Sequence, residues 1–145
     1  MRILLLNGPN LNMLGKRDQS IYGAKTLDEI NDEVIEKGRQ LNSEIVPFQS
    51  NHEGALIDFI QNESDRCDGI IINPGALTHY GLSLMDALSD AKLPVIEIHI
   101  SDIHAREDFR KVSVIEPIAK AQISGKGWKG YLEALDVLID ILKGC

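Results

Sequence analysis

GIIIN, residues 69–73, is apolar along most of its length and is followed at once by proline and glycine. A short run of this kind, rich in β-branched residues and closed by turn residues, predicts a strand buried on both faces. Strands of that type belong to parallel sheets, because helices cover both sides of such sheets. We therefore expect strands and helices to alternate along the chain on either side of this segment.

Four further segments are short and apolar, and helical patterns lie between them. The other predicted strands are residues 2–6, 44–49, 94–98 and 119–124. Apolar spacing predicts helices behind a Thr26–Glu29 capping box, around 56–60, over 82–88 and over 132–142. We also expect a short helical piece at 106–110. Five strands alternating with helices predict an α/β fold with a five-stranded parallel sheet, a flavodoxin-like three-layer arrangement in which residues 1–145 form a single domain.

The composition limits the partners of the chain. Its 145 residues carry 22 acids against 15 bases, a net charge of −7 without a basic stripe, which argues against nucleic acid as a partner. The apolar runs are much shorter than the roughly 20 residues that span a bilayer, so we expect no membrane contact. Met1-Arg2 leads straight into a predicted strand without space for a signal peptide, and Cys67 and Cys145 have no metal or redox spacing. We therefore expect a cytoplasmic protein.

Polar runs follow three of the predicted strands, at residues 7–12, 73–79 and 97–106. Ligands of parallel sheets bind beyond the carboxyl ends of the strands, near the switch in strand order, so the three runs should meet at one rim. Asparagine, glycine and proline in the first two runs are also ordinary turn chemistry. His99, two residues after Glu97 on one strand face, is either an oriented acid or base or a satisfied core pair. Arg106 and Arg110 are more commonly a solvated helix face.

The sequence lacks the residues that several kinds of binding site and catalytic site need. Gly8 and Gly15 are too far apart for a phosphate-binding loop, and Arg17 stands where a magnesium-binding hydroxyl would be. His99 and His104 lie in non-helical sequence without a matching pair, so we expect no metal. No serine lies in a nucleophile elbow. The remaining asparagines, histidines, arginines and a loop tyrosine suit proton abstraction beside a carbonyl group, with anion-binding groups around it.

Three motifs together resemble type II 3-dehydroquinate dehydratase: NGPNLNMLGKR with YG shortly after it (residues 7–17 and 22–23), NPGALTH (73–79) and IEIHISDIHAREDFR (96–110). The resemblance covers essentially the whole chain. It implies a flavodoxin-like catalytic domain that removes water from 3-dehydroquinate to give 3-dehydroshikimate in the shikimate pathway. It also implies an enzyme without a cofactor that assembles as a dodecamer built from trimers.

The resemblance assigns catalytic roles to five residues. It makes Tyr22 the base that removes the proton next to the ketone, and Arg17 a lid cation that helps Tyr22 to ionise. Asn10 would hold a water against the enolate oxygen. His99, oriented by Glu97, would protonate the departing hydroxyl. Glycines at the two ends of GKRDQSIYG, residues 15–23, would let this segment open and close as a lid that carries its own base.

The same resemblance implies a set of substrate-binding residues. Asn73, with Gly75 beside it and the backbone amides of Ile100 and Ser101, would bind the substrate carboxylate, which suits adjacent amides. The ring hydroxyls would be bound by His79 and Arg110. A second lid arginine would be Arg106, and a neighbouring subunit would contribute Asp86.

The sequence also departs from the family pattern at four positions. Gln19 stands where proline is usual, so we expect a less preorganised lid. Tyr80, Gly81 and Met85 change the pocket wall and the subunit contact. Two other hypotheses stay open at this point: a flavodoxin-like module that binds a nucleotide or a flavin without catalysis, and a lyase or isomerase for a related cyclic hydroxy acid.

Overall fold

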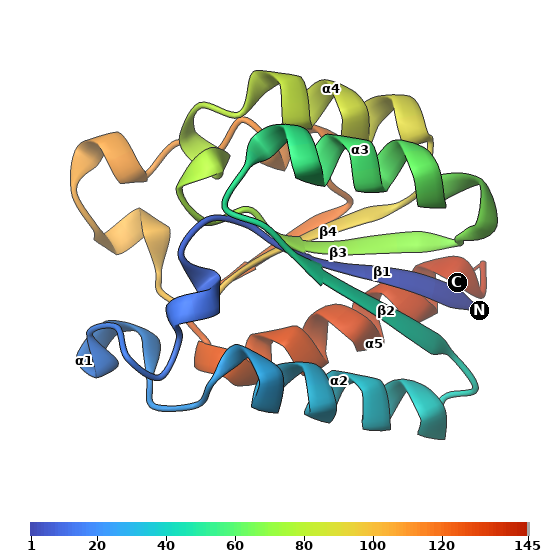
Figure 1. The fold of residues 1–145 in the computed structure, drawn as a ribbon, viewed down its shortest axis with the longest axis horizontal. Coiled ribbons are helices and arrows are strands. Elements are labelled where there is room, and N and C mark those ends of the chain that lie inside the picture. The colour runs from blue at the N-terminus through green and yellow to red at the C-terminus, as the bar shows by residue number, and fades with distance from the viewer. Residues whose placement is uncertain (145) are drawn as a thin grey trace.

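Five parallel strands form one sheet in the order β2-β1-β3-β4-β5, and helices cover both of its faces. The structure is a computed structural model that describes residues 1–144, so Cys145 lies outside the described residues. Figure 1 shows α3 and α4 on one side of the sheet and α2 and α5 on the other, with the N-terminus and the end of α5 at the same end of the sheet. The predicted flavodoxin-like α/β fold is therefore confirmed.

The predicted strands and long helices are all present, with small shifts at their ends. The strands are β1 (Arg2–Asn7), β2 (Glu44–Gln49), β3 (Gly69–Asn73), β4 (Val95–His99) and β5 (Ala121–Ser124). The helices are α1 (Gln19–Tyr22), α2 (Leu27–Gln40), α3 (Glu53–Glu63), α4 (Leu82–Ala91) and α5 (Gly130–Leu142). No helix among residues 1–144 is long and apolar enough to cross a membrane.

The packing explains why these segments fold as they do. Strand residues alternate between two apolar clusters, so that Ile3 and Leu5 face α2 and α5 whereas Leu4 and Leu6 face α3 and α4. The predicted capping box at the start of α2 is confirmed, because Thr26 Oγ1 accepts from Glu29 N at 3.2 Å and a Glu29 oxygen accepts from Thr26 N at 3.0 Å.

The strand order places one crevice at the carboxyl ends of β1 and β3. The chain leaves β1 toward β2 on one side and later returns to β3 on the other, which is the switch point of this fold. Asn7 and Asn73, the last residues of these two strands, are register partners, and Gly8 N donates to Asn73 O at 2.8 Å. Two of the three polar runs therefore begin side by side.

Three local predictions differ from the structure. Residues 106–110 do not form one helical piece: 3-10 turns at Ile103–Ala105 and Asp108–Arg110 flank an extended Arg106. The side chain of Asp102 accepts from His104 N and caps the first turn. The first turn therefore begins before Arg106, and the second is a separate element after it. The stretch 15–23 is not only loop, because Asp18 caps the helical turn α1 within it. The fifth strand begins at Ala121, since a 3-10 turn at Glu116–Ile118 precedes it.

Candidate active site

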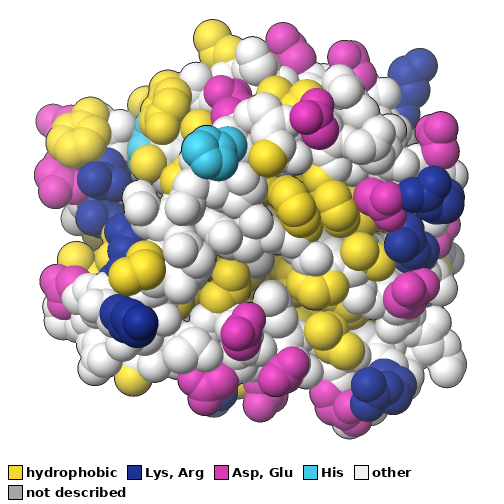
Figure 2. Space-filling model, viewed as in Figure 1, with side chains coloured by type: hydrophobic (Ala, Val, Ile, Leu, Met, Phe, Trp, Pro, Cys, Tyr) yellow, Lys and Arg dark blue, Asp and Glu magenta, His cyan; other side chains and the backbone are white. Residues whose placement is uncertain are grey.

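The three polar runs and the 15–23 segment enclose a cavity of about 100 Å³ at the carboxyl ends of the strands. Figure 2 shows Lys and Arg side chains gathered at this end of the molecule (dark blue, left). The residues that line the cavity are Pro9, Asn10, Leu11, Arg17, Tyr22, Asn73, Gly75, Ala76, His79, His99, Ile100, Ser101, Ile103, Arg106 and Arg110. Since drug-sized ligands need roughly 300 Å³ or more, this cavity suits a small molecule rather than a flavin.

Two glycines let the loops after β1 and β3 approach each other closely. A Cβ atom on Gly8 would lie 2.3 Å from Pro74 O, and one on Gly75 would lie 2.9 Å from Pro9 O. Gly75 also has a φ of 61°, which favours glycine. Only residues without side chains fit this contact, and it brings Asn10 and Asn73 to the same cavity.

A buried tyrosine, Tyr131, fixes the side-chain amide of Asn73. Tyr131 OH donates to Asn7 Oδ1 at 2.6 Å, so it accepts from Asn73 Nδ2 at 2.9 Å, and Asn73 Oδ1 accepts from Gly75 N at 3.1 Å. Burial raises the pKa of the Tyr131 phenol well above its ordinary range, so the phenol stays a neutral donor. Asn73 therefore keeps its second N–H as a donor, which suits an anionic group.

His99 and Glu97 form a buried pair at the end of β4. His99 Nε2 lies 2.5 Å from Glu97 Oε2, and these side chains are 6% and 0% exposed. Burial alone would raise the pKa of the Glu97 carboxyl, but hydrogen bonds from the histidine and from two hydroxyl groups hold this pKa below its ordinary value. A charged Glu97 fixes the ring, and Nδ1 is the His99 nitrogen that remains for a ligand.

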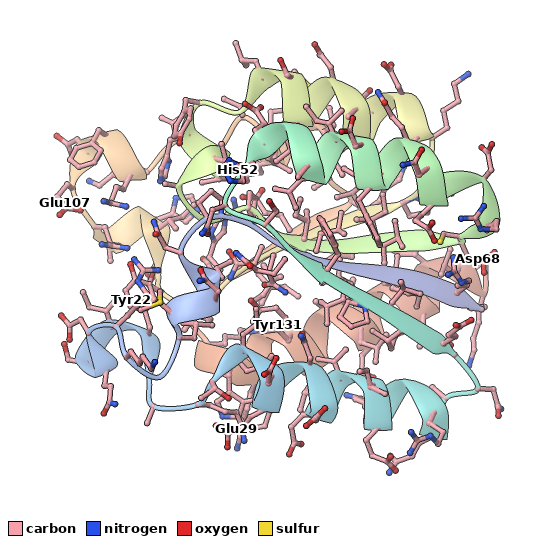
Figure 3. The ribbon with its side chains drawn as sticks, in the orientation of Figure 1. Tyr22, Glu29, His52, Asp68, Glu107 and Tyr131 are labelled. Atoms are coloured by element: carbon pink, nitrogen blue, oxygen red, sulfur yellow. The ribbon has the colours of Figure 1, made fainter. Side chains whose placement is uncertain are left out.

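Tyr22 lies between two arginines that come from distant parts of the chain. Arg17 Nη2 donates to Tyr22 OH at 3.1 Å, and Arg106 Nη1 donates to the same oxygen at 2.9 Å. The Arg17 guanidinium also lies 3.9 Å from the centre of the Tyr22 ring. Figure 3 shows Tyr22 at the end of α1, on the same side of the molecule as Glu107. Two guanidinium groups from different segments thus donate to one phenol oxygen.

Known proteins are similar to this chain in sequence and in fold. The family model described as dehydroquinase class II matches residues 1–139. The chain is 56% identical over 139 residues to a 3-dehydroquinate dehydratase of Roseiflexus castenholzii, covering 96% of this chain and 88% of the relative. It is 51% identical over 142 residues to one of Halothermothrix orenii, covering 98% and 96%. The crystal structure of type II dehydroquinase from Butyrivibrio crossotus gives a TM-score of 0.93 at 47% identity, over 96% of this chain and 97% of that one.

The chain belongs to the class II dehydroquinase family. It is therefore an enzyme, a lyase whose reaction is the dehydration of 3-dehydroquinate. The non-catalytic binding module is set aside by this result, whereas the residue roles implied by the resemblance stay predictions.

Most of the predicted site residues of this chain line one cavity, and two do not. The cavity is shared by Arg17, Tyr22, His79, His99 and the other predicted residues, whereas Glu97 lies directly behind His99. Asp86 is exposed on α4 and does not line the cavity of its own chain. The solvated-face hypothesis for the arginines was wrong, since the side chains of Arg106 and Arg110 are only 20% and 31% exposed and line the cavity.

Several contacts orient the remaining groups of the cavity. His79 Nδ1 lies 2.7 Å from Val112 O, and because a carbonyl can only accept, this nitrogen carries a proton and Nε2 remains for a ligand. Asn10 adopts a left-handed backbone conformation with φ of 69°, and its N–H donates to Asn51 Oδ1 at 3.0 Å. Within residues 1–144, no group of three or more His, Cys, Asp or Glu side chains could hold a metal ion.

The sequence interpretation missed the residues that support this site. Thr78 and Ser113 contact Glu97, Tyr131 contacts Asn73, and Asn51 contacts Asn10. Tyr131 gave a weak signal, because it is a polar group on the otherwise apolar face of α5. A serine in the connection before β5 gave none. These pairs join residues far apart in the chain, so spacing does not indicate them.

Proposed function

We propose that the chain dehydrates 3-dehydroquinate through an enolate, with Tyr22 as the base and His99 as the acid. The observation that carries the proposal is the presence of two different proton carriers in one small cavity. One is a phenol oxygen that accepts from two guanidinium groups. The other is an imidazole paired with a buried carboxylate. Pairs of groups whose surroundings favour opposite protonation states suit acid and base catalysis.

In the first step the Tyr22 phenolate takes a proton from the carbon next to the ketone. The electrons of the broken C–H bond move to the ketone oxygen and form an enolate. Asn10, which lines the cavity, would hold a water against that oxygen. Donors that are already in place stabilise such charge more effectively than bulk water does.

In the second step the enolate electrons return and the C–O bond of the departing hydroxyl breaks. His99 supplies the proton, so that the hydroxyl leaves as water in an anti elimination. The charged Glu97 stabilises the protonated ring before this transfer. Exchange of protons with solvent then resets Tyr22 and His99 for the next turnover.

The other cavity residues would hold the substrate. The free N–H of Asn73, with Gly75 and the backbone of Ile100 and Ser101, would bind its carboxylate. His79 and Arg110 would contact the ring hydroxyls, and Arg106 would close over the substrate with the lid. A panel of related cyclic hydroxy acids, followed by the absorbance of the conjugated enone, separates 3-dehydroquinate from other substrates.

Assembly is a second part of the proposal. We propose a dodecamer of trimers in the cytoplasm in which Asp86 reaches the cavity of a neighbouring subunit. The position of Asp86 on the exposed surface of α4 supports a contact outside its own chain. Sedimentation of the active protein tests this directly, since a fully active monomer would contradict it.

The reaction type is tested by chelation and borohydride. An enolate mechanism needs neither a metal nor a lysine imine, so EDTA and borohydride with substrate should both leave the rate unchanged. Loss of activity with EDTA, or a substrate adduct trapped by borohydride, would overturn the proposed mechanism.

A further inference from the structure

Two buried hydroxyl groups lie behind the His99–Glu97 pair, outside the cavity. Thr78 belongs to the 3-10 turn Gly75–His79 that follows β3, and Ser113 to the connection between β4 and β5. Thr78 is 0% and Ser113 is 8% exposed, and their hydroxyl oxygens lie 2.8 Å apart. Both contact the carboxylate of Glu97, at 2.6 Å from Thr78 and 2.8 Å from Ser113 to the same oxygen.

The hydrogen-bond partners of Ser113 determine where its proton points. Its oxygen already accepts from Ile115 N at 3.1 Å and from Glu116 N at 3.0 Å, which uses both lone pairs. The hydroxyl proton must therefore be donated, and the Glu97 oxygens at 2.8 and 2.9 Å are within reach. Thr78 is closer still to the carboxylate and donates to it as well. Both hydroxyls thus stabilise the charged form of Glu97.

The charge of Glu97 decides which residue carries the proton that it shares with His99. Without other donors, a fully buried carboxyl favours its neutral form and would take this proton. The ring would then be a neutral imidazole, which is a weak acid. The cations of the cavity, Arg17, Arg106 and Arg110, disfavour a further positive charge on the His99 ring, which faces them. No acid is found among the lining residues that the structure describes, whose other titratable members are Tyr22 and His79.

We propose that Thr78 and Ser113 are positioning residues that keep the shared proton on His99 Nε2, so that the protonated ring is available as the acid. This inference rests on the proposed role of His99 in the reaction. The two hydroxyls act through Glu97 and do not touch the substrate.

Thr78 and the segment around Ser113 also have a structural role, which the experiments must separate from the proposed positioning of the proton. Val114 N donates to Thr78 O at 2.7 Å, and Val112 O contacts His79 Nδ1, so residues 112–114 also anchor the segment that carries Arg106 and Arg110. These contacts use backbone atoms of residues 78, 112 and 114. Thr78→Val keeps the side-chain shape and the backbone contact and removes only the hydroxyl, whereas Thr78→Ser keeps the hydroxyl.

The kinetic test compares these two variants with Ser113→Ala. Thr78→Val and Ser113→Ala should each lower kcat about tenfold with KM nearly unchanged, which is the lower end of the effect that outer hydrogen-bond partners have on metal-binding histidines. Thr78→Ser should recover most of the loss. Ser43→Ala is the matched control, because Ser43 is equally buried, at 7% exposed, in the turn before β2. Equal kcat for Thr78→Val and wild type would overturn the inference.

A double-mutant cycle separates this inference from the proposed function. If the hydroxyls act through His99, Thr78→Val should cost nothing further in a His99→Ala background. A tenfold loss in both backgrounds would overturn the inference while the acid role of His99 stands. Wild-type activity of His99→Ala itself would instead defeat the proposed function.

Nitrogen NMR of the ligand-free protein gives a readout without turnover. With 15N-labelled histidine, and His99→Ala to assign the signal, Nε2 of His99 should carry a proton in the wild type. In the Thr78→Val/Ser113→Ala double variant it should become an acceptor nitrogen. An unchanged Nε2 signal in a folded double variant would overturn the inference whatever its rate.

Discussion

The two walls of the cavity are built differently. On the sheet side Asn73, Glu97 and His99 are almost fully buried. Partners on other elements hold Asn73 and Glu97, and Glu97 in turn holds His99 on the same strand. On the opposite side Arg17 and Tyr22 are half-buried. They lie between Gly15 and Gly23, which have φ of 90° and 79°, and Tyr22 ends the short turn that Asp18 caps. The hydrogen bond from Arg106 to Tyr22 joins the 15–23 segment to the 103–110 segment.

This difference separates two requirements of the reaction. Groups that bind an anion and donate a proton work best when they are fixed before the substrate arrives, because no reorganisation is then needed. A base on a movable segment allows substrate entry and comes into place only when water is excluded. Gln19 in place of the usual proline predicts a less preorganised lid. One contact opposes this effect, because Gln19 Nε2 donates to Gly15 O at 2.9 Å.

The largest expected effect comes from the wall that we propose to be movable, the 15–23 segment. Tyr22→Phe removes only the phenol oxygen and should lower kcat by about a hundred- to ten-thousand-fold, the usual contribution of a general base. Substrate binding, measured by calorimetry, should persist because the carboxylate site is on the other wall. Tyr80→Phe is the matched control, since Tyr80 is 63% exposed. If the variant keeps more than roughly a few per cent of the wild-type rate, the loss is smaller than a general base normally contributes. That result would place the base elsewhere.

A smaller effect is expected when one of the two cations is removed. Arg17→Ala leaves Arg106 on the phenol oxygen, so we expect kcat to fall about tenfold, equivalent to about 1.4 kcal/mol of transition-state stabilisation. Added guanidinium ion should restore part of the rate by occupying the vacated position. Lys16→Ala, an exposed neighbour, should have no effect. Equal losses in Arg17→Ala and Lys16→Ala would mean that only net charge matters.

A substitution in the fixed wall should affect the stability of the protein and substrate binding more than the rate of the chemical step. Tyr131→Phe leaves Asn73 Nδ2 and Asn7 Oδ1 without their partner and should cost about 1–3 kcal/mol in the free energy of unfolding. KM should rise several-fold while kcat changes little, because the Asn73 amide can then rotate. Urea unfolding and steady-state kinetics measure both effects. An unchanged KM would show that Tyr131 supports the fold alone.

Sequence reasoning succeeded where the determinants are local. The capping box of α2 joins residues three positions apart, and the pairing of Glu97 with His99 follows from side chains two apart on one strand. Strand ends and the rim were predictable because apolar strands of a parallel sheet end together.

Contacts between distant segments could not be predicted in the same way. Arg106 reaches a tyrosine 84 positions earlier, and Tyr131 an asparagine 58 positions earlier. Such pairs depend on how whole elements pack. The failure over 106–110 has a similar origin. The two arginines lie one helical turn apart, which favours a helix, whereas Arg106 is extended and contacts Tyr22 across the cavity.

One measurement tests most directly whether the base lies on the movable wall and the acid on the fixed wall. Exchange of the proton next to the ketone is followed in D₂O by NMR, alongside net dehydration. In His99→Ala, exchange should continue while dehydration falls by about a hundredfold or more. In Tyr22→Phe, both should be lost together. Exchange that survives in Tyr22→Phe, or that falls in parallel with dehydration in His99→Ala, would contradict this division of roles between the two walls.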